Sequence, residues 1–333
     1  MPGKIIDINK LKELILETDN ILIIPHTDPD ADALGSALGL RWIFNKLGKS
    51  SEIICDTRVN DKNCMCFDIG PELDNISLDD IKDYDYIIAV DTASAGMLGK
   101  SLEDYKIDLV IDHHVTNNLF ARANYINDKA AAAGEIIFDL AKELELELDI
   151  EFAKYIYSAI VSDSGAFKFS ATTARTMRAA AELMETGLDF ARLNRLIFEN
   201  KSLEQIKIER LAYNNLRFYN NGRIAVINIT RELKRENGLE GCELDGISAI
   251  PKVISGVEVG VLIKEEDNIN NIEQEFRISL RSNEYVDVAK LAKSFDGGGH
   301  IRAAGFSFMP EPGLENPAEH IENLLIEKIE SVL

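Results

Sequence analysis

The feature that most constrains the fold is a set of short, continuous apolar runs separated by helix-length segments. Runs of this kind occupy residues 21–24, 51–55, 86–90 and 108–111. An uninterrupted apolar run of this length is typical of a strand buried on both faces, as in a parallel sheet covered by helices. The first part of the chain is therefore predicted to be an α/β domain with a doubly wound, mostly parallel sheet. Apolar spacing predicts its helices over residues 8–18, 32–47, 131–146, 150–161 and 173–186.

The pattern changes after residue 187 and divides the chain into three predicted parts. Residues 1–187 form the α/β domain, and residues 188–218 have the helical periodicity of a connector. Residues 219–333 are expected to form a smaller α/β domain with a mixed sheet. Its predicted strands are 223–230, 256–265 and 275–282, its helices are 242–250, 286–294 and 317–332, and residues 267–275 are expected to form a polar hairpin loop.

The acidic composition limits what the chain can bind. Its formal net charge is −21 over 333 residues. Proteins that bind long nucleic acids derive most of that affinity from many Lys and Arg side chains, which displace counterions. A chain this acidic is badly suited to that task. An anionic substrate is therefore expected to be small, or to be received by bound cations and a few placed basic side chains, and no long nucleic acid is an expected partner.

Nothing in the sequence indicates export or a membrane. The amino terminus has scattered acidic residues and no continuous apolar core, and no apolar run approaches the roughly 20 residues that cross a bilayer. Cys55, Cys64, Cys66 and Cys242 lack the paired spacing of a zinc finger, so reduced thiols are expected. The sequence predicts a cytoplasmic protein.

Acidic and histidine residues follow several of the apolar segments, where open α/β sheets place their ligands. The segments are HTDPDADALGS from His26, VDTAS around Asp91, IDHHVTN around Asp112 and SDSGAF around Asp163. A single acidic residue at a strand end is usually a helix cap or a turn former, but the four segments together favour a metal site. Imidazole and carboxylate suit Mn²⁺ and related divalent ions, and two ions about 4 Å apart can hold a phosphoryl centre when one carboxylate bridges them.

The histidines support this interpretation. His26, His113 and His114 lie in these segments, and His300 lies in a glycine-rich segment, residues 296–300, that is expected to form a loop. Only His320 has the setting of an ordinary surface residue. Glycines let a backbone approach a ligand closely and expose N–H groups to an anion, so the glycine-rich segment is a candidate for binding phosphate or base.

The four segments resemble, in order, the motifs of the DHH phosphoesterases, and GGGHIRAAGF at residues 297–306 resembles the signature of the DHH-associated domain. The resemblance covers about residues 20–310. The family includes RecJ-type exonucleases, family II inorganic pyrophosphatases and the short-oligonucleotide nucleases called nanoRNases. The second signature occurs in the RecJ and nanoRNase branches, whereas the pyrophosphatases carry a different second domain.

The resemblance implies a role for each motif residue. His114 would bind a phosphate oxygen or protonate the leaving group, and Asp112 would orient an imidazole. Asp28, where many nanoRNase-like sequences have Asn, is interpreted as a turn residue. The ions are expected to be Mn²⁺, with Mg²⁺ or Co²⁺ as alternatives. The implied ligands are His26 and Asp30 for one ion, Asp32, His113 and Asp163 for the other, and Asp91 as the bridge.

In the second domain the resemblance implies that Arg281, Gly298, Gly299 and His300 bind the far end of the substrate across a cleft. Arg302 ranks below Arg281 as a substrate ligand, because its small neighbours Ala303 and Ala304 indicate tight packing. An apolar helix face could also support a homodimer.

The function that best fits is hydrolysis of very short oligoribonucleotides to 5′-mononucleotides by metal-activated hydroxide, with pAp (3′-phosphoadenosine 5′-phosphate) as a further substrate. A cyclic di-AMP or pApA phosphodiesterase is the alternative, and the sequence does not separate the two. A RecJ-like exonuclease needs an extra oligonucleotide-binding domain and a basic track, and a pyrophosphatase needs a different second domain. A non-catalytic nucleotide-binding module would require a lost ligand, yet every motif position carries a competent residue.

Overall fold

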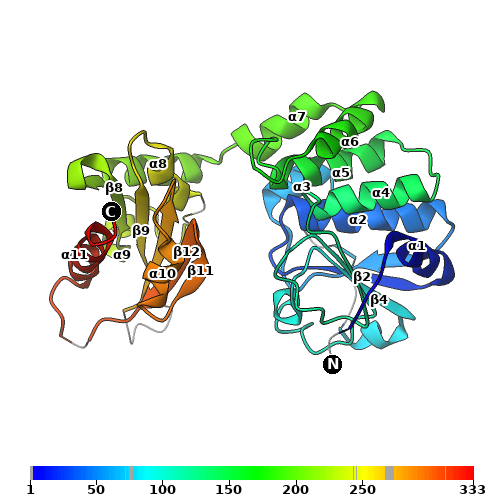
Figure 1. Cartoon of the computed structure of the whole chain (residues 1–333), viewed down its shortest axis with the longest axis horizontal. Helices are drawn as coiled ribbons and strands as arrows, with labels where there is room; N and C mark the ends of the chain where they lie inside the picture. Colours follow the sequence, from blue (N-terminus) through cyan, green and yellow to red (C-terminus); the bar gives the residue numbers. More distant parts are fainter. Residues whose placement is uncertain are drawn as a thin grey trace. The chain divides into compact units, whose positions relative to one another are not determined.

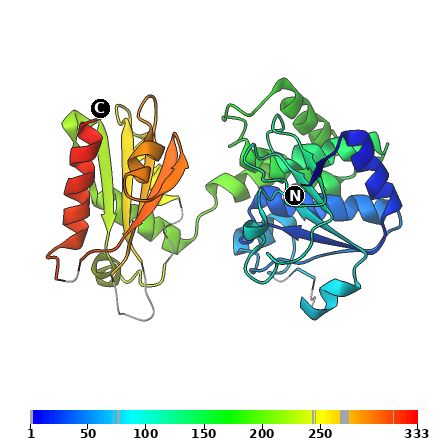
Figure 2. The same ribbon diagram turned by 60° about the horizontal axis from the view of Figure 1, so that its bottom comes forward.

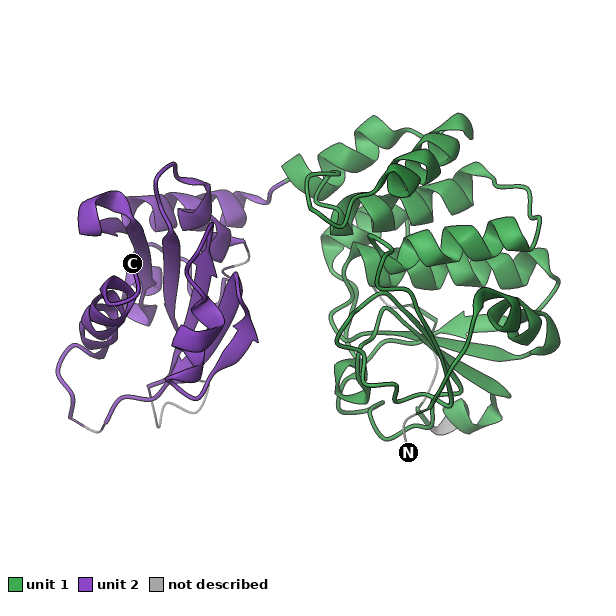
Figure 3. Cartoon of the chain, viewed as in Figure 1, with its two compact units in different colours: residues 1–200 green, residues 201–333 purple. Residues whose placement is uncertain are grey.

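The computed structural model describes residues 3–71, 73–74, 78–242, 244, 246–266, 274–311 and 313–333. The chain divides into two compact units, residues 1–200 and 201–333 (Figure 3). The boundary falls within the helical stretch after residue 187, between a π-helical turn at Arg195–Glu199 and α8 at Leu203–Asn214. Most of the hairpin loop predicted at 267–275 lies outside the described residues.

Unit 1 is an α/β domain, as predicted. Its described residues form a six-stranded sheet in the order β1-β6-β5-β4-β2-β3, and every neighbouring pair of strands is parallel. The strands are β1 Lys4–Ile5, β2 Ile21–Pro25, β3 Ser51–Ile53, β4 Tyr86–Val90, β5 Leu109–Asp112 and β6 Ala123–Ile126. The helices are α1 Ile8–Glu17, α2 Ala31–Lys46, α3 Asp61–Phe67, α4 Ala133–Glu143, α5 Ile150–Asp163, α6 Ala174–Glu185 and α7 Phe190–Asn194, with 3₁₀ turns η1 Leu78–Asp83 and η2 Ala95–Leu98.

The central strands are buried on both faces, which explains their continuous apolar runs. Ile21 and Ile23 of β2 belong to the cluster that α1, α2, α4 and α5 cover, whereas Leu22 and Ile24 face a second cluster. That second cluster is closed by the 3₁₀ turns and by loops. Figure 1 shows the long helices gathered on one side of the sheet.

The order of the strands fixes where a ligand site can form. From β2 the chain passes to β3 on one side, and β4, β5 and β6 then follow on the other side. The switch point of the sheet therefore lies between β2 and β4, which pair from Ile21 with Tyr86 to Pro25 with Val90. Open α/β sheets bind ligands beyond the carboxyl ends of the strands at such a point. The residues that follow these two strands are His26 and Asp91.

Unit 2 is a smaller α/β domain with a mixed sheet, again as predicted. Its described strands follow the order β11-β12-β10-β9-β8-β7, in which β8 and β9 are parallel and the other pairs are antiparallel. The strands are β7 Leu216–Tyr219, β8 Ile224–Ile229, β9 Val259–Glu265, β10 Phe276–Ser282, β11 Gly298–His300 and β12 Ala303–Phe308. The other elements are α9 Arg231–Glu236, α10 Val288–Lys293, α11 Pro317–Glu330 and the 3₁₀ turns η4 Asn220–Gly222, η5 Ile247–Ala249 and η6 Pro251–Val253.

Two expectations for unit 2 differ from the structure. A helix was predicted at 242–250, but the only helical element among the described residues of this range is the 3₁₀ turn η5. Turn η5 follows Gly246, whose backbone is left-handed (φ 75°). The glycine-rich segment is not an open loop, because Gly298–His300 pair with Ala303–Gly305 as a short antiparallel hairpin. Figure 2 shows α11 lying along one face of the unit 2 sheet. Its residues Ile321, Leu325 and Ile329 belong to the core of this unit.

Two further findings concern the helices and the cysteines. No helix in the described ranges is both long and apolar enough to cross a membrane. The four cysteines are free thiols, as the sequence predicted.

Helix α2 carries part of the candidate site and is held close to α5. A methyl group on Gly35 would lie 2.5 Å from the carbonyl oxygen of Tyr155 and 3.1 Å from Cβ of Ala159. The two backbones can approach this closely only because residue 35 has no side chain. The glycine of the ALGS segment therefore fixes the depth of α2 against α5.

We predict that Gly35→Ala lowers the free energy of unfolding by about 1–3 kcal/mol, because α2 must move away from the Tyr155 carbonyl. Helix propensity alone would give a gain of about 1 kcal/mol for the same change. Urea denaturation followed by circular dichroism measures the difference. Asn45→Ala, at an exposed position of the same helix, serves as the control and should change stability by less than about 0.5 kcal/mol. A stabilised Gly35→Ala protein would contradict the packing argument.

Candidate functional site

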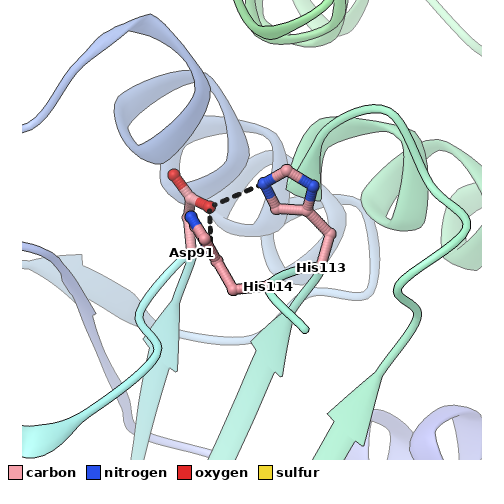
Figure 4. Close-up of side chains that lie close together, drawn as sticks. All are labelled: Asp91, His113 and His114. Atoms are coloured by element: carbon pink, nitrogen blue, oxygen red, sulfur yellow. Dashed lines mark ion pairs between the residues drawn. The ribbon is translucent and has the colours of Figure 1, made fainter. Parts of the chain in front are cut away.

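Asp91 lies at the centre of the candidate site. It follows β4 in a left-handed conformation (φ 52°), which Asp tolerates better than most residues, and its side chain is almost fully buried. Its two carboxylate oxygens face different imidazoles: Oδ2 is 3.8 Å from Nε2 of His26, and Oδ1 is 3.4 Å from Nε2 of His113. Figure 4 shows Asp91 between the strand ends, with His113 and His114 directed toward it.

The first group around Asp91 contains His26 and Asp30, and one potential ligand atom from each of the three lies within 4.8 Å of the others. Asp30 caps α2, where its Oδ1 accepts hydrogen bonds from the backbone N–H groups of Asp32 and Ala33 at 2.9 and 3.0 Å. His26 Nδ1 lies 2.7 Å from the carbonyl oxygen of Thr27. Because a carbonyl can only accept, Nδ1 carries the hydrogen, and the lone pair of neutral His26 is left on Nε2, toward the carboxylates.

The second group contains Asp32, His113 and Asp163, again with ligand atoms within 4.8 Å of one another. His113 repeats the arrangement of His26. Its Nδ1 lies 3.3 Å from the carbonyl of Ala130, and its Nε2 lies 3.7 Å from Asp32 and 3.3 Å from Asp163. An imidazole that donates through one nitrogen to a carbonyl and presents the other to its neighbours has the orientation common among metal-bound histidines.

Asp32 is completely buried and is stabilised by the start of α4. It accepts hydrogen bonds from the backbone N–H groups of Ala133 and Gly134 at 2.7 and 2.8 Å, and from Ser36 Oγ at 3.1 Å. The N-terminus of a helix carries a partial positive charge, so α4 favours a carboxylate here. This support was not predicted from the sequence. The signal for it is the run of small residues at 130–134, which leaves two backbone donors accessible.

The shortest contact of His114 is with Asp112. Its Nδ1 also lies 3.6 Å from Oδ1 of Asp91, and Asp91, His113 and His114 form a third group with potential ligand atoms within 4.8 Å of one another. Nδ1 of His114 lies 2.7 Å from Oδ1 of the fully buried Asp112, whose Oδ2 accepts a hydrogen bond from Asn117 Nδ2 at 2.6 Å. Asn117 also donates to the carbonyl of Thr92 at 3.0 Å, which joins the two strand ends. Asn117 is a second residue that sequence reasoning missed, although it ends the IDHHVTN segment.

The hydrogen bonds of Asp112 and His114 set their protonation states. Burial alone would raise the pKa of Asp112, but the bonds from His114 and Asn117 lower it below its ordinary value. The bond to Asp112 in turn raises the pKa of His114. Asp112 is therefore ionised, His114 Nδ1–H donates to it, and the side chain of His114 remains 39% exposed.

Other pKa shifts in the cluster indicate that its carboxylates favour nearby positive charge. Burial, with Asp91 and Asp163 nearby, raises the pKa of Asp32 well above its ordinary value, and burial is also the main reason that the pKa of Asp163 is raised to about 6. Burial alone would lower the pKa of His113 and His26. The neighbouring carboxylates reverse this and raise the pKa to about 10 and about 9 respectively. Protons on the imidazoles are thus one source of the positive charge, and metal ions are another.

The residues present fit two divalent cations that share Asp91. Asp91 Oδ1 is buried and accepts no hydrogen bond from any described residue, although His113 Nε2 and His114 Nδ1 lie 3.4 and 3.6 Å from it. A buried carboxylate oxygen without a hydrogen bond is costly unless a cation meets it. Asp28 lies outside these groups: it is an exposed turn residue (φ 51°) whose backbone N–H donates to Thr57 Oγ1 at 2.7 Å. The arrangement can therefore bind two cations, with one carboxylate between them and an exposed imidazole beside them.

In unit 2, three of the four predicted substrate-binding residues come together. Arg281, Gly298 and Gly299 line a cavity of about 410 Å³ on the β10, β11 and β12 strands. Exposed His300 ends β11 and is not among the residues that line this cavity. The guanidinium of Arg302 donates to the carbonyls of Val286 and Glu284, which explains structurally why it is less available than Arg281.

Two family models match the chain. Residues 20–160 match the DHH family, N-terminal domain, and residues 221–332 match the DHHA1 domain. The chain is 30% identical to the probable bifunctional oligoribonuclease and PAP phosphatase NrnA of Streptococcus mutans, over 92% of this chain and 95% of that protein. It is 29% identical to the bifunctional oligoribonuclease and PAP phosphatase NrnA of Bacillus subtilis, over 87% of this chain and 89% of that protein.

A crystal structure of an exopolyphosphatase-related protein from Bacteroides fragilis has a similar fold. Its TM-score against this chain is 0.82, with 22% sequence identity over 98% of this chain and 96% of that one. This similarity concerns the fold.

We predict that Mn²⁺ stabilises the protein and that Asp91→Asn removes most of the effect. A metal present at 100 times its dissociation constant adds about 2.7 kcal/mol per site to the free energy of unfolding. Thermal unfolding with and without Mn²⁺ measures this without any assay of activity. Asp28→Asn makes the same chemical change in the neighbouring turn and should keep the full Mn²⁺ effect. Equal stabilisation of the wild type and Asp91→Asn would rule out a shared metal ligand at this position.

Proposed function

This chain belongs to the DHH family of phosphoesterases, and from that premise we propose that it hydrolyses very short oligoribonucleotides to 5′-mononucleotides and pAp to AMP. The observation that carries the proposal is the position of Asp91, whose two oxygens face His26 and His113 from opposite sides of one carboxylate. Such a carboxylate can serve two cations at once, which is the arrangement used to hold a phosphoryl group for in-line attack. The relatives named as oligoribonuclease and PAP phosphatase support the choice of substrates.

We assign the metal ligands as His26 and Asp30 for one ion, Asp32, His113 and Asp163 for the other, and Asp91 for both. Mn²⁺ is the ion we propose. Mg²⁺ prefers oxygen ligands in a nearly ideal octahedron and usually keeps several waters, whereas each ligand set here includes an imidazole. When bound, two such ions supply Lewis-acid charge to the phosphoryl oxygens and lower the pKa of an attacking water.

The two proposed reactions break the same kind of bond. Release of a 5′-mononucleotide from an oligoribonucleotide breaks the bond between phosphorus and a nucleoside 3′-oxygen, and conversion of pAp to AMP does the same. Water adds its oxygen to phosphorus, and the 3′-oxygen leaves with the electron pair and takes up a proton. A sugar alkoxide is a poor leaving group, so a positioned acid is needed.

His114 is the residue we assign to that proton. Asp112 fixes its Nδ1–H and favours the charged imidazolium, so Nε2–H is the group free to donate to the leaving 3′-oxygen. Asp112 acts through His114, by holding the ring and its charge. In unit 2 we assign binding of a substrate phosphate or base to Arg281, Gly298, Gly299 and His300, since a guanidinium and exposed backbone N–H groups suit an anion.

The proposal is tested by assaying four kinds of substrate in parallel with Mn²⁺: a ladder of oligoribonucleotides from dimers to 24-mers, pAp, cyclic di-AMP with pApA, and pyrophosphate. We expect the shortest oligomers and pAp to be consumed and the longest to persist, because the net charge of −21 repels long polyanions. Asp91→Asn, prepared identically, is the control for contaminating nucleases. Faster opening of cyclic di-AMP would indicate a signalling phosphodiesterase instead, and inactivity on all four would overturn the proposal.

We predict that His114→Asn lowers kcat for a dinucleotide by about 10²–10⁴-fold, the usual contribution of a general acid, with a smaller change in KM. A substrate whose leaving group needs no proton separates this role from simple binding. Hydrolysis of thymidine 5′-(p-nitrophenyl phosphate) releases p-nitrophenolate, which needs no proton. The kcat of His114→Asn for this substrate should therefore fall far less than its kcat for the dinucleotide. An equal loss on both substrates would contradict proton donation and indicate that His114 binds the phosphoryl oxygens.

A further inference from the structure

We propose that Arg277 forms a second phosphate-binding position on β10, so that the protein binds oligonucleotides of three or more residues better than dimers. The inference rests on the proposed function and concerns the length of the substrate. No family motif identified in the sequence includes Arg277. The position follows from the register of the strands in unit 2.

The alternation of side chains along β10 places Arg277 on the same face as Arg281. Phe276, Ile278 and Leu280 are at most 1% exposed and belong to the core of unit 2. Successive side chains of a strand point to opposite faces, so Arg277, Ser279 and Arg281 lie together on the other face. All three line the cavity of about 410 Å³ that also contains Gly298 and Gly299.

The neighbouring strands keep this face open. Arg277, Ser279 and Arg281 pair across to Ser307, Gly305 and Ala303 of β12, whose side chains are small or absent. A methyl group on Gly298 would meet no atom within 4 Å. The result is a groove with a flexible cation at each end, a hydroxyl between them and a floor of small residues.

Neither arginine is neutralised by a carboxylate among the described residues. Within the described part of the chain, the guanidinium of Arg281 donates only to the carbonyl of its neighbour Leu280, at 3.1 Å. The guanidinium of Arg277 makes no hydrogen bond or ion pair with any described residue. Lys264, opposite Arg277 on β9, is paired with Glu266 at 3.0 Å. Two unpaired guanidinium groups on one small face are a site for anions in a chain of net charge −21.

The distance between the two arginines sets the shortest oligonucleotide that can contact both of them. Arg277 and Arg281 are four residues apart, so their Cα atoms are separated by about 13 Å along the strand. That span exceeds one nucleotide step. When one phosphate binds Arg281, Arg277 can therefore bind only a phosphate at least two nucleotide steps further along the oligonucleotide. A dinucleotide or pAp has no such phosphate.

The test is to measure binding of unlabelled, 5′-phosphorylated oligoribonucleotides, from dimer to pentamer, to the full chain by isothermal titration calorimetry in EDTA, where they are not hydrolysed. We expect Arg277→Ala to weaken binding of the tetramer by about tenfold, as one lost charge-assisted contact does, and to change dimer binding by less than about twofold. Arg277→Lys should retain part of the tetramer affinity. Arg281→Ala should weaken binding of both the dimer and the tetramer.

Arg210→Ala is the matched control. Arg210 is exposed on α8 of the same unit and lies outside the groove, so its loss removes the same charge and should leave both affinities unchanged. The salt dependence is a second readout. The slope of log affinity against log salt for the tetramer should decrease in magnitude by about 0.7 in Arg277→Ala, the value for one phosphate contact on a single strand.

Each result decides between the two proposals. Unchanged tetramer affinity in Arg277→Ala, equal losses for dimer and tetramer, or no binding of any oligomer to the wild type would overturn the second phosphate position. Hydrolysis by the wild type with Mn²⁺ is measured separately on the same oligomers. Length-dependent binding that Arg277→Ala removes, without any hydrolysis by the wild type, would preserve this inference and refute the proposed function.

Discussion

The main physical constraint on the candidate site of unit 1 is that several carboxylates lie close together in a largely buried place. Like charges in a buried place repel one another and lose their hydration, so each carboxylate must be compensated. Asp32 is compensated by the two backbone N–H groups at the start of α4, and Asp112 by His114 and Asn117. Asp91 Oδ1 has no such donor among the described residues. The protein thus supplies hydrogen-bond donors to Asp32 and Asp112 by itself and leaves Asp91 Oδ1 without one.

The fold provides this cluster by bringing strand ends together. In a parallel sheet the carboxyl ends of adjacent strands lie at one edge, and the switch between β2 and β4 opens a space there without a strand crossing it. Helix α2 starts directly after β2 and brings Asp30 and Asp32 to the same edge, while its glycine at position 35 lets α5, which ends at Asp163, pack against it. Backbone geometry rather than side-chain flexibility therefore determines the positions of the carboxylates.

The sequence was sufficient to predict the parts of the structure that have a strong local pattern. The runs at 21–24, 86–90 and 108–111 predicted strands because both faces of β2, β4 and β5 are buried. The short strands β1, at one edge of the sheet, and β6, beside it, gave no such run. Strand β11 was interpreted as a loop because glycines carry no side-chain pattern. The segments that supply the site were visible as acidic and histidine clusters, but their grouping into separate ligand sets was inferred from family resemblance. The supporting donors were missed, because the backbone of α4 and the side chain of Asn117 become partners of Asp32 and Asp112 only through tertiary structure.

The candidate sites of the two units carry opposite charge, although the chain is acidic overall. In unit 1 the candidate site concentrates negative charge, so it attracts cations and cannot bind a phosphate without them. In unit 2 the arginines of β10 remain free of carboxylate partners among the described residues, whereas Arg217 and Arg231 of the same unit are paired with Glu322 and Glu265. An acidic protein that leaves a few cations unpaired on one face can hold a small anion there, while its net charge opposes longer polyanions. The proposed selection of short substrates then follows from the distribution of charge, and the proposal needs no separate barrier to long chains.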